Sequence, residues 1–173
     1  MIYHYFGDKE GLYRAIFRQQ WGELKDWFDR SIKDRLDSGI PLPADPKGLL
    51  IESLLVASDF MAGNQRFVRL VMWEGLEGGH ISRSIWTDVR GPLYVQVEFL
   101  IKQAQEDGTL DPKLDPAHLV ISFLGAIGFY FAYAPALADM IHKEPFSASA
   151  LDQRKQELRR LMAPIGDLPG LKV

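Results

Sequence analysis

The chain opens with MIYHYFGDKEGLYRAIF, residues 1–17, and this stretch decides how the rest is arranged. Gly7 can adopt the left-handed conformation that commonly ends a helix. Asp8 is a favourable N-cap, because its carboxylate can accept a hydrogen bond from an orphan backbone N–H of the next turn. The stretch therefore predicts the end of one helix, a tight turn, and the start of a second helix after Asp8.

Apolar residues continue this second helix to about Leu36. They recur at three- and four-residue steps, as in Leu12, Ile16, Leu24, Phe28 and Ile32. At a rise of 1.5 Å per residue such a helix is roughly 40 Å long. A rod of that length can couple two domains mechanically, and the glycine and prolines of residues 39–43 end it.

The remaining sequence also predicts helices, and it contains no strand pair with a hairpin signal. Asp45-Pro46 and Asp115-Pro116 each place an N-cap acid before a proline at the first helical position. Further helices are expected over residues 65–76, from Pro92 to about residue 104, and over about 147–162, while residues 80–91 are ambiguous. The count is about six or seven helices, which predicts an all-α bundle.

Composition narrows the class of protein. The 173 residues carry a net charge of −3 and include no cysteine. Disulfides, thiolate zinc sites and cysteine nucleophiles are therefore excluded. A DNA-binding domain is usually basic over its contact face, so this chain is not mainly a DNA-binding surface. No signal peptide is visible, and a cytoplasmic protein is expected.

One uncharged segment, residues 119–138, is 20 residues long and could span a bilayer by length. Gly125, Gly128 and Pro135 interrupt it, and no lysine-rich flank orients it. A helix that is apolar all round is also typical of a buried or interface helix. We favour the second interpretation, so no membrane association is expected.

Catalytic motifs are missing from the sequence. The four histidines are scattered, and neither a metalloprotease helix motif, a nucleophile elbow nor a phosphate-binding loop is present. The glycine-rich residues 74–80 follow no strand and are interpreted as a flexible helix end. We therefore predict that the chain is not an enzyme, and no cofactor or metal site is predicted.

The pattern Ile-Tyr-x-Tyr-Phe-x-x-Lys-Glu-x-Leu, from Ile2 to Leu12, resembles the junction of the TetR-type transcriptional repressors. There it joins the recognition helix of the helix-turn-helix to a long helix of the regulatory domain. The resemblance implies that residues 1–7 are the end of a recognition helix and 8–36 the connecting helix. Residues 37–163 would be the regulatory, ligand-binding and dimerisation domain, and 164–173 a tail.

The same resemblance implies contacts with DNA phosphates from Tyr3, His4, Tyr5 and Lys9. A tyrosine hydroxyl and a lysine ammonium at a helix start can both meet phosphate oxygens, without reading sequence. Phe6 is expected instead to pack in the core, on Leu12 and Ile16. The family has two further helices and most of the recognition helix before this point, so operator binding is expected only when those elements are present.

Aromatic and sulfur side chains concentrate in the middle helices, and a bundle cavity lined by them would bind an apolar or aromatic small molecule. For any one of them plain core is the alternative. Glu74 shares a helical side with Phe67, Leu70 and Val71. A carboxylate on an apolar side must be paired, be protonated or take part in ligand binding. The structural alternative is an ion pair with an arginine at position 66, 69, 83 or 90. The candidate ligand-binding residues are Phe60, Phe67, Met72, Trp73, Glu74, Trp86, Tyr94, Phe123 and Tyr130.

A dimer interface is predicted late in the chain. Small and apolar residues share one helical face there, and a narrow leucine stripe follows in the last helix, which together suit a four-helix interface. Packing of the same faces within one chain is the alternative. The candidate interface residues are Ile121, Gly125, Gly128, Ala132, Leu151, Leu158 and Leu161.

Together these features predict a homodimeric, ligand-responsive transcriptional regulator, most simply a repressor. Its effector would tilt the connecting helix and change the separation of two recognition helices. The alternative is a stand-alone dimeric module that binds a small molecule or a protein and does not bind DNA.

Overall fold

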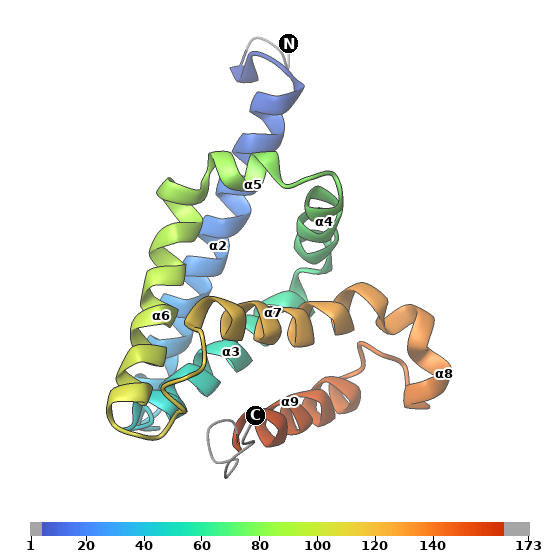
Figure 1. The fold of residues 1–173 in the computed structure, drawn as a ribbon. Helices are drawn as coiled ribbons and strands as arrows, with labels where there is room; N and C mark the ends of the chain where they lie inside the picture. The colour runs from blue at the N-terminus through green and yellow to red at the C-terminus, as the bar shows by residue number, and fades with distance from the viewer. Residues whose placement is uncertain (1–4, 165–173) are drawn as a thin grey trace.

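The structure, a computed structural model, describes residues 5–164, except for the side chains of residues 89 and 90. Within that part of the chain every regular element is helical (Figure 1). The elements are α2 (Lys9–Asp37), α3 (Pro46–Gly63), α4 (Gln65–Leu76), α5 (His80–Ser84), the π-helical turn η1 (Trp86–Arg90), α6 (Gly91–Glu106), α7 (Pro116–Tyr133), the 3-10 turn η2 (Ala134–Leu137), α8 (Ala138–Ile141) and α9 (Ala148–Met162). The all-α prediction is confirmed. The elements that were not predicted are short: α5 and η1 lie in the ambiguous residues 80–91, and η2 and α8 follow α7.

The helix starts follow the predicted caps. Asp8 accepts a hydrogen bond from the Gly11 N–H at 2.7 Å, and Asp45 and Asp115 cap α3 and α7 in the same way. Gly7 has a φ of +77°, which a residue with a side chain rarely adopts. The turn between the two predicted helices therefore forms as the sequence indicated.

The connecting helix α2 spans 29 residues and runs through most of the molecule's height (Figure 1). Its middle packs against α3 and α4 through a mainly aromatic cluster, in which Leu24 lies against Phe60 and Phe67; it is called the aromatic cluster below. The rings of Phe60 and Phe67 meet edge to face, with centroids 5.4 Å apart. Its first turns project beyond the bundle, and Phe6, which was expected in the core, is half-exposed there.

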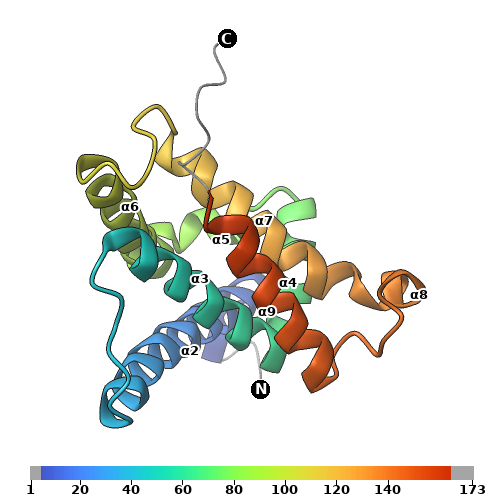
Figure 2. The ribbon, with the colours of Figure 1, turned by 90° about the horizontal axis from the view of Figure 1, so that it is seen from below.

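The main core lies where α3, α6, α7 and α9 meet. Leu54, Ile101, Ile127 and Leu158 are almost fully buried in it. Seen from below, α9 lies across α3 and α7 (Figure 2). Glu52 on α3 links the C-terminal ends of α2 and α9. Its carboxylate pairs with Arg35 of α2 at 2.9 Å and with Arg159 of α9 at 2.7 Å.

The predicted dimer residues divide between the core and the surface. Leu158 is 1% exposed, Gly128 lies under Met72 of α4, and Ala132 and Leu151 pack against the main core. Leu158 and Gly128 are therefore corrected to packing within the chain, because one chain already covers them. Ile121, Gly125 and Leu161 remain exposed.

Leu158→Ala is expected to lower the free energy of unfolding by about 2–3 kcal/mol, because it leaves a cavity in the main core. Leu161→Ala, at a site that is 60% exposed, is expected to change it by less than about 0.5 kcal/mol. Urea unfolding of both variants, at one protein concentration, checks the pair. Equal losses would contradict the placement of these two leucines.

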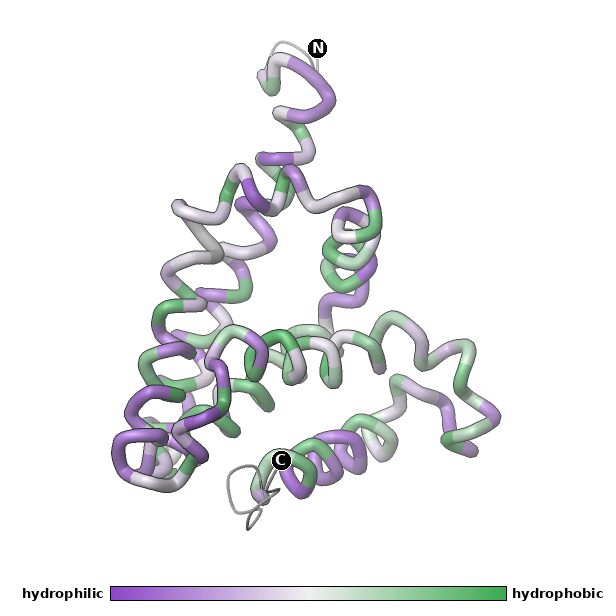
Figure 3. The backbone as a smooth tube through the Cα atoms, viewed as in Figure 1, coloured by the Kyte–Doolittle hydropathy of each residue, from purple (hydrophilic) through white to green (hydrophobic). Residues whose placement is uncertain are grey.

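Along α7 the residues are mostly hydrophobic or near neutral, whereas α9 alternates between hydrophobic and hydrophilic residues (Figure 3). Ile121, Leu124, Phe129 and Tyr133 of α7 are all exposed. The stretch Pro116–Ile141 is long and apolar enough to cross a membrane by length and composition. Only 33% of its most apolar 18-residue window is buried inside the chain. The apolar stretch is thus a core helix on one side and an uncovered surface on the other.

Candidate ligand-binding site

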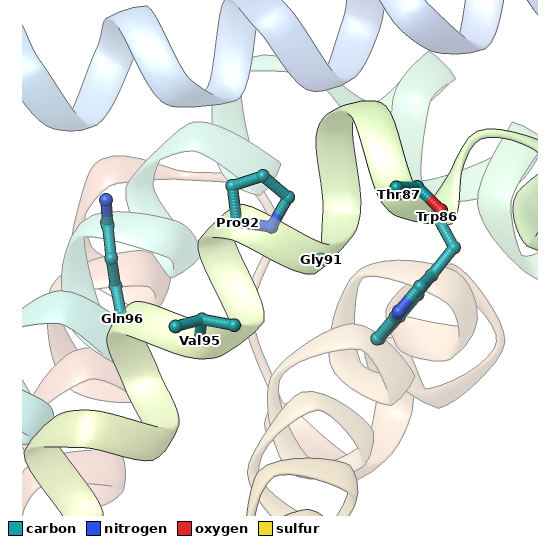
Figure 4. A pocket seen from close by; sticks show the side chains of 6 residues that line it. All are labelled: Trp86, Thr87, Gly91, Pro92, Val95 and Gln96. Atoms are coloured by element: carbon teal, nitrogen blue, oxygen red, sulfur yellow. The ribbon is translucent and has the colours of Figure 1, made fainter.

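A hollow of about 630 Å³ opens beside η1 and the first turns of α6. Its size falls within the range of small-molecule sites. In Figure 4 the ring of Trp86 extends from η1, while Pro92, Val95 and Gln96 follow one another along α6. Its lining residues are Trp86, Thr87, Gly91, Pro92, Val95 and Gln96. A smaller hollow, of about 490 Å³ at the turn between α3 and α4, has walls that are about equally polar and apolar.

Local structure explains how Trp86 comes to line the hollow. Ile85 is fully buried and fixes the start of η1. A Cβ at Gly91 would lie 2.9 Å from the Trp86 carbonyl oxygen, so glycine permits this close turn into α6. The ring of Trp86 lies 5.7 Å from that of Tyr94, which in turn packs against the main core. The hollow therefore has an aromatic wall anchored in the core.

Most of the nine candidate ligand residues lie elsewhere. Trp86 lines the hollow. Tyr94 does not line it but packs against the ring of Trp86. Phe60 and Phe67 are buried in the aromatic cluster with α2, and Phe123 is buried in the main core. The structure thus separates these aromatic residues into two packed clusters and one open hollow.

Tyr130 forms part of a strut between α7 and α9. Its hydroxyl donates to the Pro145 carbonyl at 2.7 Å, and the guanidinium of Arg154 lies 5.2 Å from its ring. Arg154 also donates to the Ala126 carbonyl at 2.6 Å. Burial raises the pKa of Tyr130 and lowers the pKa of Arg154. These contacts give Tyr130 a structural role remote from the hollow.

The helix α4 bridges α7 and α2. The Cε of Met72 would lie 2.6 Å from a Cβ at Gly128 of α7. The next residue, Trp73, has its ring centroid 6.1 Å from that of Tyr13 on α2. Met72 and Trp73 therefore connect the late helices with the connecting helix.

Glu74 is 4% exposed and holds α5 against α4. Its carboxylate accepts hydrogen bonds from the backbone N–H of Ile81 at 2.9 Å and of Ser82 at 3.3 Å. The hydroxyl of Ser82 also donates to it. An arginine was the structural alternative that the sequence offered, and among the described side chains the partners of this carboxylate are instead the backbone and hydroxyl groups of α5.

An ion pair links the hollow to α2. Arg18 on α2 lies 2.8 Å from the carboxylate of Asp88, and Asp88 belongs to η1, the same turn that supplies Trp86 and Thr87. The two residues are 70 positions apart, and no local pattern marks them. Sequence reasoning therefore missed this contact, as it missed the hollow residues of α6.

The candidate phosphate contacts lie at the far end of α2. Tyr3 and His4 fall outside the described residues. Tyr5 is exposed, and the Lys9 ammonium lies 5.7 Å from the ring of Tyr13. Tyr5 and Lys9 are accessible at the end of α2 that projects from the bundle (Figure 1).

Comparison with known protein families identifies the later part of the chain. A family model described as the tetracyclin repressor-like, C-terminal domain matches residues 49–161, which is more than half of the chain. No curated protein matches the chain.

Proposed function

The chain belongs to the tetracyclin repressor-like family, and from that premise we propose that it is the regulatory part of a ligand-responsive transcriptional regulator. In this proposal the protein is cytoplasmic and non-enzymatic, acts as a repressor, and works as a homodimer. Operator binding would require the two further helices and the complete recognition helix that precede the connecting helix in this family. The match to the family supports the regulatory role, and the remaining points are inferences from the residues.

The proposed effector is an uncharged, apolar or aromatic small molecule. The hollow supports this because Trp86, Pro92 and Val95 supply apolar contact, while Thr87 and Gln96 supply polar groups that can orient a ligand. Residues 86–97 carry charge only at Asp88 and Arg90, and Asp88 is paired with Arg18 of α2. A charged effector would therefore find little compensation among the lining side chains.

One observation carries the regulatory proposal: η1 contributes both to the hollow and to the contact with α2. A ligand that displaces Trp86 and Thr87 moves the turn on which Asp88 sits. Because α2 is one continuous helix from Lys9 to Asp37, a push at Arg18 tilts its free end. A ligand shifts such an equilibrium only by its difference in affinity for the two arrangements.

The experiment is a distance measurement between the free ends of the two connecting helices of the dimer. The chain has no cysteine, so Glu10→Cys introduces a single thiol for a spin label. We expect saturating Nile red, an uncharged aromatic probe, to change the label-to-label distance by several ångströms. Binding of the probe without any change in distance would contradict the regulatory role and favour the alternative of a stand-alone binding module.

The link through Asp88 gives a second prediction. Asp88→Asn is expected to change the free energy of unfolding by less than about 1 kcal/mol, because both partners of the ion pair are half-exposed. It is also expected to reduce the probe-induced distance change by at least half. Asp29→Asn, in the exposed Lys25–Asp29 pair of α2, is the matched control and should leave the distance change intact. An undiminished response in Asp88→Asn would rule out this route.

A further inference from the structure

The hollow is shallow and open to solvent over most of its extent, and exposed apolar residues of α6 continue beside it. Val95 and Phe99, one helical turn apart on α6, are 61% and 60% exposed. A site that binds an apolar ligand usually buries most of that ligand's surface. A single chain therefore contacts only part of a bound ligand and leaves the rest of that ligand's surface in solvent.

The uncovered surface extends from α6 to α7. These helices are in contact, and α7 begins beside the lower half of α6 (Figure 1). Ile121, in the second turn of α7, is 64% exposed. Residues 91–97 and 119–138 contain no charged residue, and the charged neighbours of Phe99 on α6, Glu98 and Lys102, pair with each other at 2.7 Å. Covering the uncharged residues with another uncharged surface leaves no unpaired charge to desolvate on α7, so a second copy of α7 is a suitable partner.

We propose that a second copy of the chain closes the hollow, with the aromatic pair Phe129 and Tyr133 of that copy as its lid. This rests on the homodimer of the proposed function. The two rings are stacked, with centroids 4.8 Å apart and planes at 10°, and both are exposed near the end of α7. The pair is a preformed apolar surface that one chain leaves in water.

Two-fold symmetry would bring the pair of one copy towards α6 of the other. Gly125 is the small residue near the middle of the outward side of α7, and no atom of the described residues lies within 4 Å of a Cβ built there. If two copies of α7 cross there in antiparallel sense, residues equally far before and after Gly125 face each other. Phe129 of one copy then meets Ile121 of the other, and Tyr133 reaches the start of α7, beside α6.

A shared site couples ligand binding to association. Each of the two hollows is complete only in the dimer, so a ligand stabilises the dimer and dimerisation raises ligand affinity by the same factor. Mutation of Phe129 and Tyr133 in one subunit would open the hollow of the other subunit.

The test places an environment-sensitive naphthalene dye on the single thiol of Val95→Cys. The labelled chain, dilute enough to be monomeric, is mixed with an excess of unlabelled wild-type chain. Anisotropy and sedimentation report association, and the emission maximum reports cover at residue 95. We expect a shift to shorter wavelength with wild-type chain, and less than half that shift with unlabelled Phe129→Ala/Tyr133→Ala chain at saturation.

Two controls establish that the lid acts between subunits. A labelled chain that itself carries both alanines should show the full shift with wild-type chain, since its lid comes from the partner. A label at Lys33→Cys on α2 should show none. If the dimer forms and the Val95 label does not shift, or shifts equally with both partners, the lid is overturned while the dimer stands. If no dimer forms at any concentration, the proposed dimer fails, and the lid with it.

Discussion

Glu74→Ala is expected to lower the free energy of unfolding by about 4 kcal/mol, since each buried donor left without an acceptor costs about 1–3 kcal/mol. The carboxylate accepts from two backbone N–H groups and one hydroxyl of α5, and Ser82 is itself buried. Without it, α5 loses the contact that holds it to α4. Guanidinium unfolding at a fixed protein concentration measures the loss, because dimerisation makes stability depend on concentration.

Two neighbouring variants make this result specific. Glu74→Gln keeps an acceptor oxygen and is expected to lose less than half as much. Glu77→Ala removes an exposed carboxylate one turn along and is expected to change stability by less than about 0.5 kcal/mol. If Glu74→Ala is as stable as Glu77→Ala, the carboxylate does not hold α5 in place.

Ile121→Glu is expected to weaken the proposed dimer by at least roughly 1000-fold, which corresponds to about 4 kcal/mol. The substitution places one carboxylate from each subunit on an otherwise uncharged face, where it has no cation to pair with. The single chain should stay folded, since Ile121 is exposed in it. Sedimentation velocity over a range of concentrations measures the change.

The matched control is Ile32→Glu, which makes the same substitution at an exposed position of α2. It should leave the association constant within about threefold of wild type. A dimer that survives Ile121→Glu and is lost in Ile32→Glu would move the interface from α7 to α2.

The helix boundaries were readable from the sequence because they depend on neighbours in the chain. Asp8, Asp45 and Asp115 each cap a helix by accepting from an N–H three residues later, and Gly7 adopts its φ without help from distant residues. The predicted start of each of these helices is confirmed for that reason.

The side that each helix turns to the core was harder to predict. Leu158 and Leu161 are three residues apart on one stripe, yet one is buried and the other exposed. A narrow stripe on α9 is compatible with packing on its own chain or on a second copy, and only the position of α3 and α7 decides between them. Gly128 was assigned to the dimer for the same reason, although Met72 of α4 covers it.

The candidate site also combines residues that the sequence identified with contacts that depend on tertiary packing. Trp86 was identified as an aromatic in an ambiguous segment, whereas Val95 and Gln96 look like ordinary positions of an amphipathic helix. The contact between Arg18 and Asp88 could not be predicted, because it depends on how η1 meets α2. A hollow is the space that packed elements leave between them, and no local pattern encodes it.

The sequence by itself determined the all-α class, the capped helix starts and, through the pattern from Ile2 to Leu12, the resemblance that the family match confirms. Each of these depends on interactions within a few residues. Tertiary structure alone decided that Glu74 holds α5, that η1 joins the hollow to α2, and that the outward side of α7 stays uncovered. These depend on which surfaces meet, because burial is a property of the assembled helices and not of any one of them.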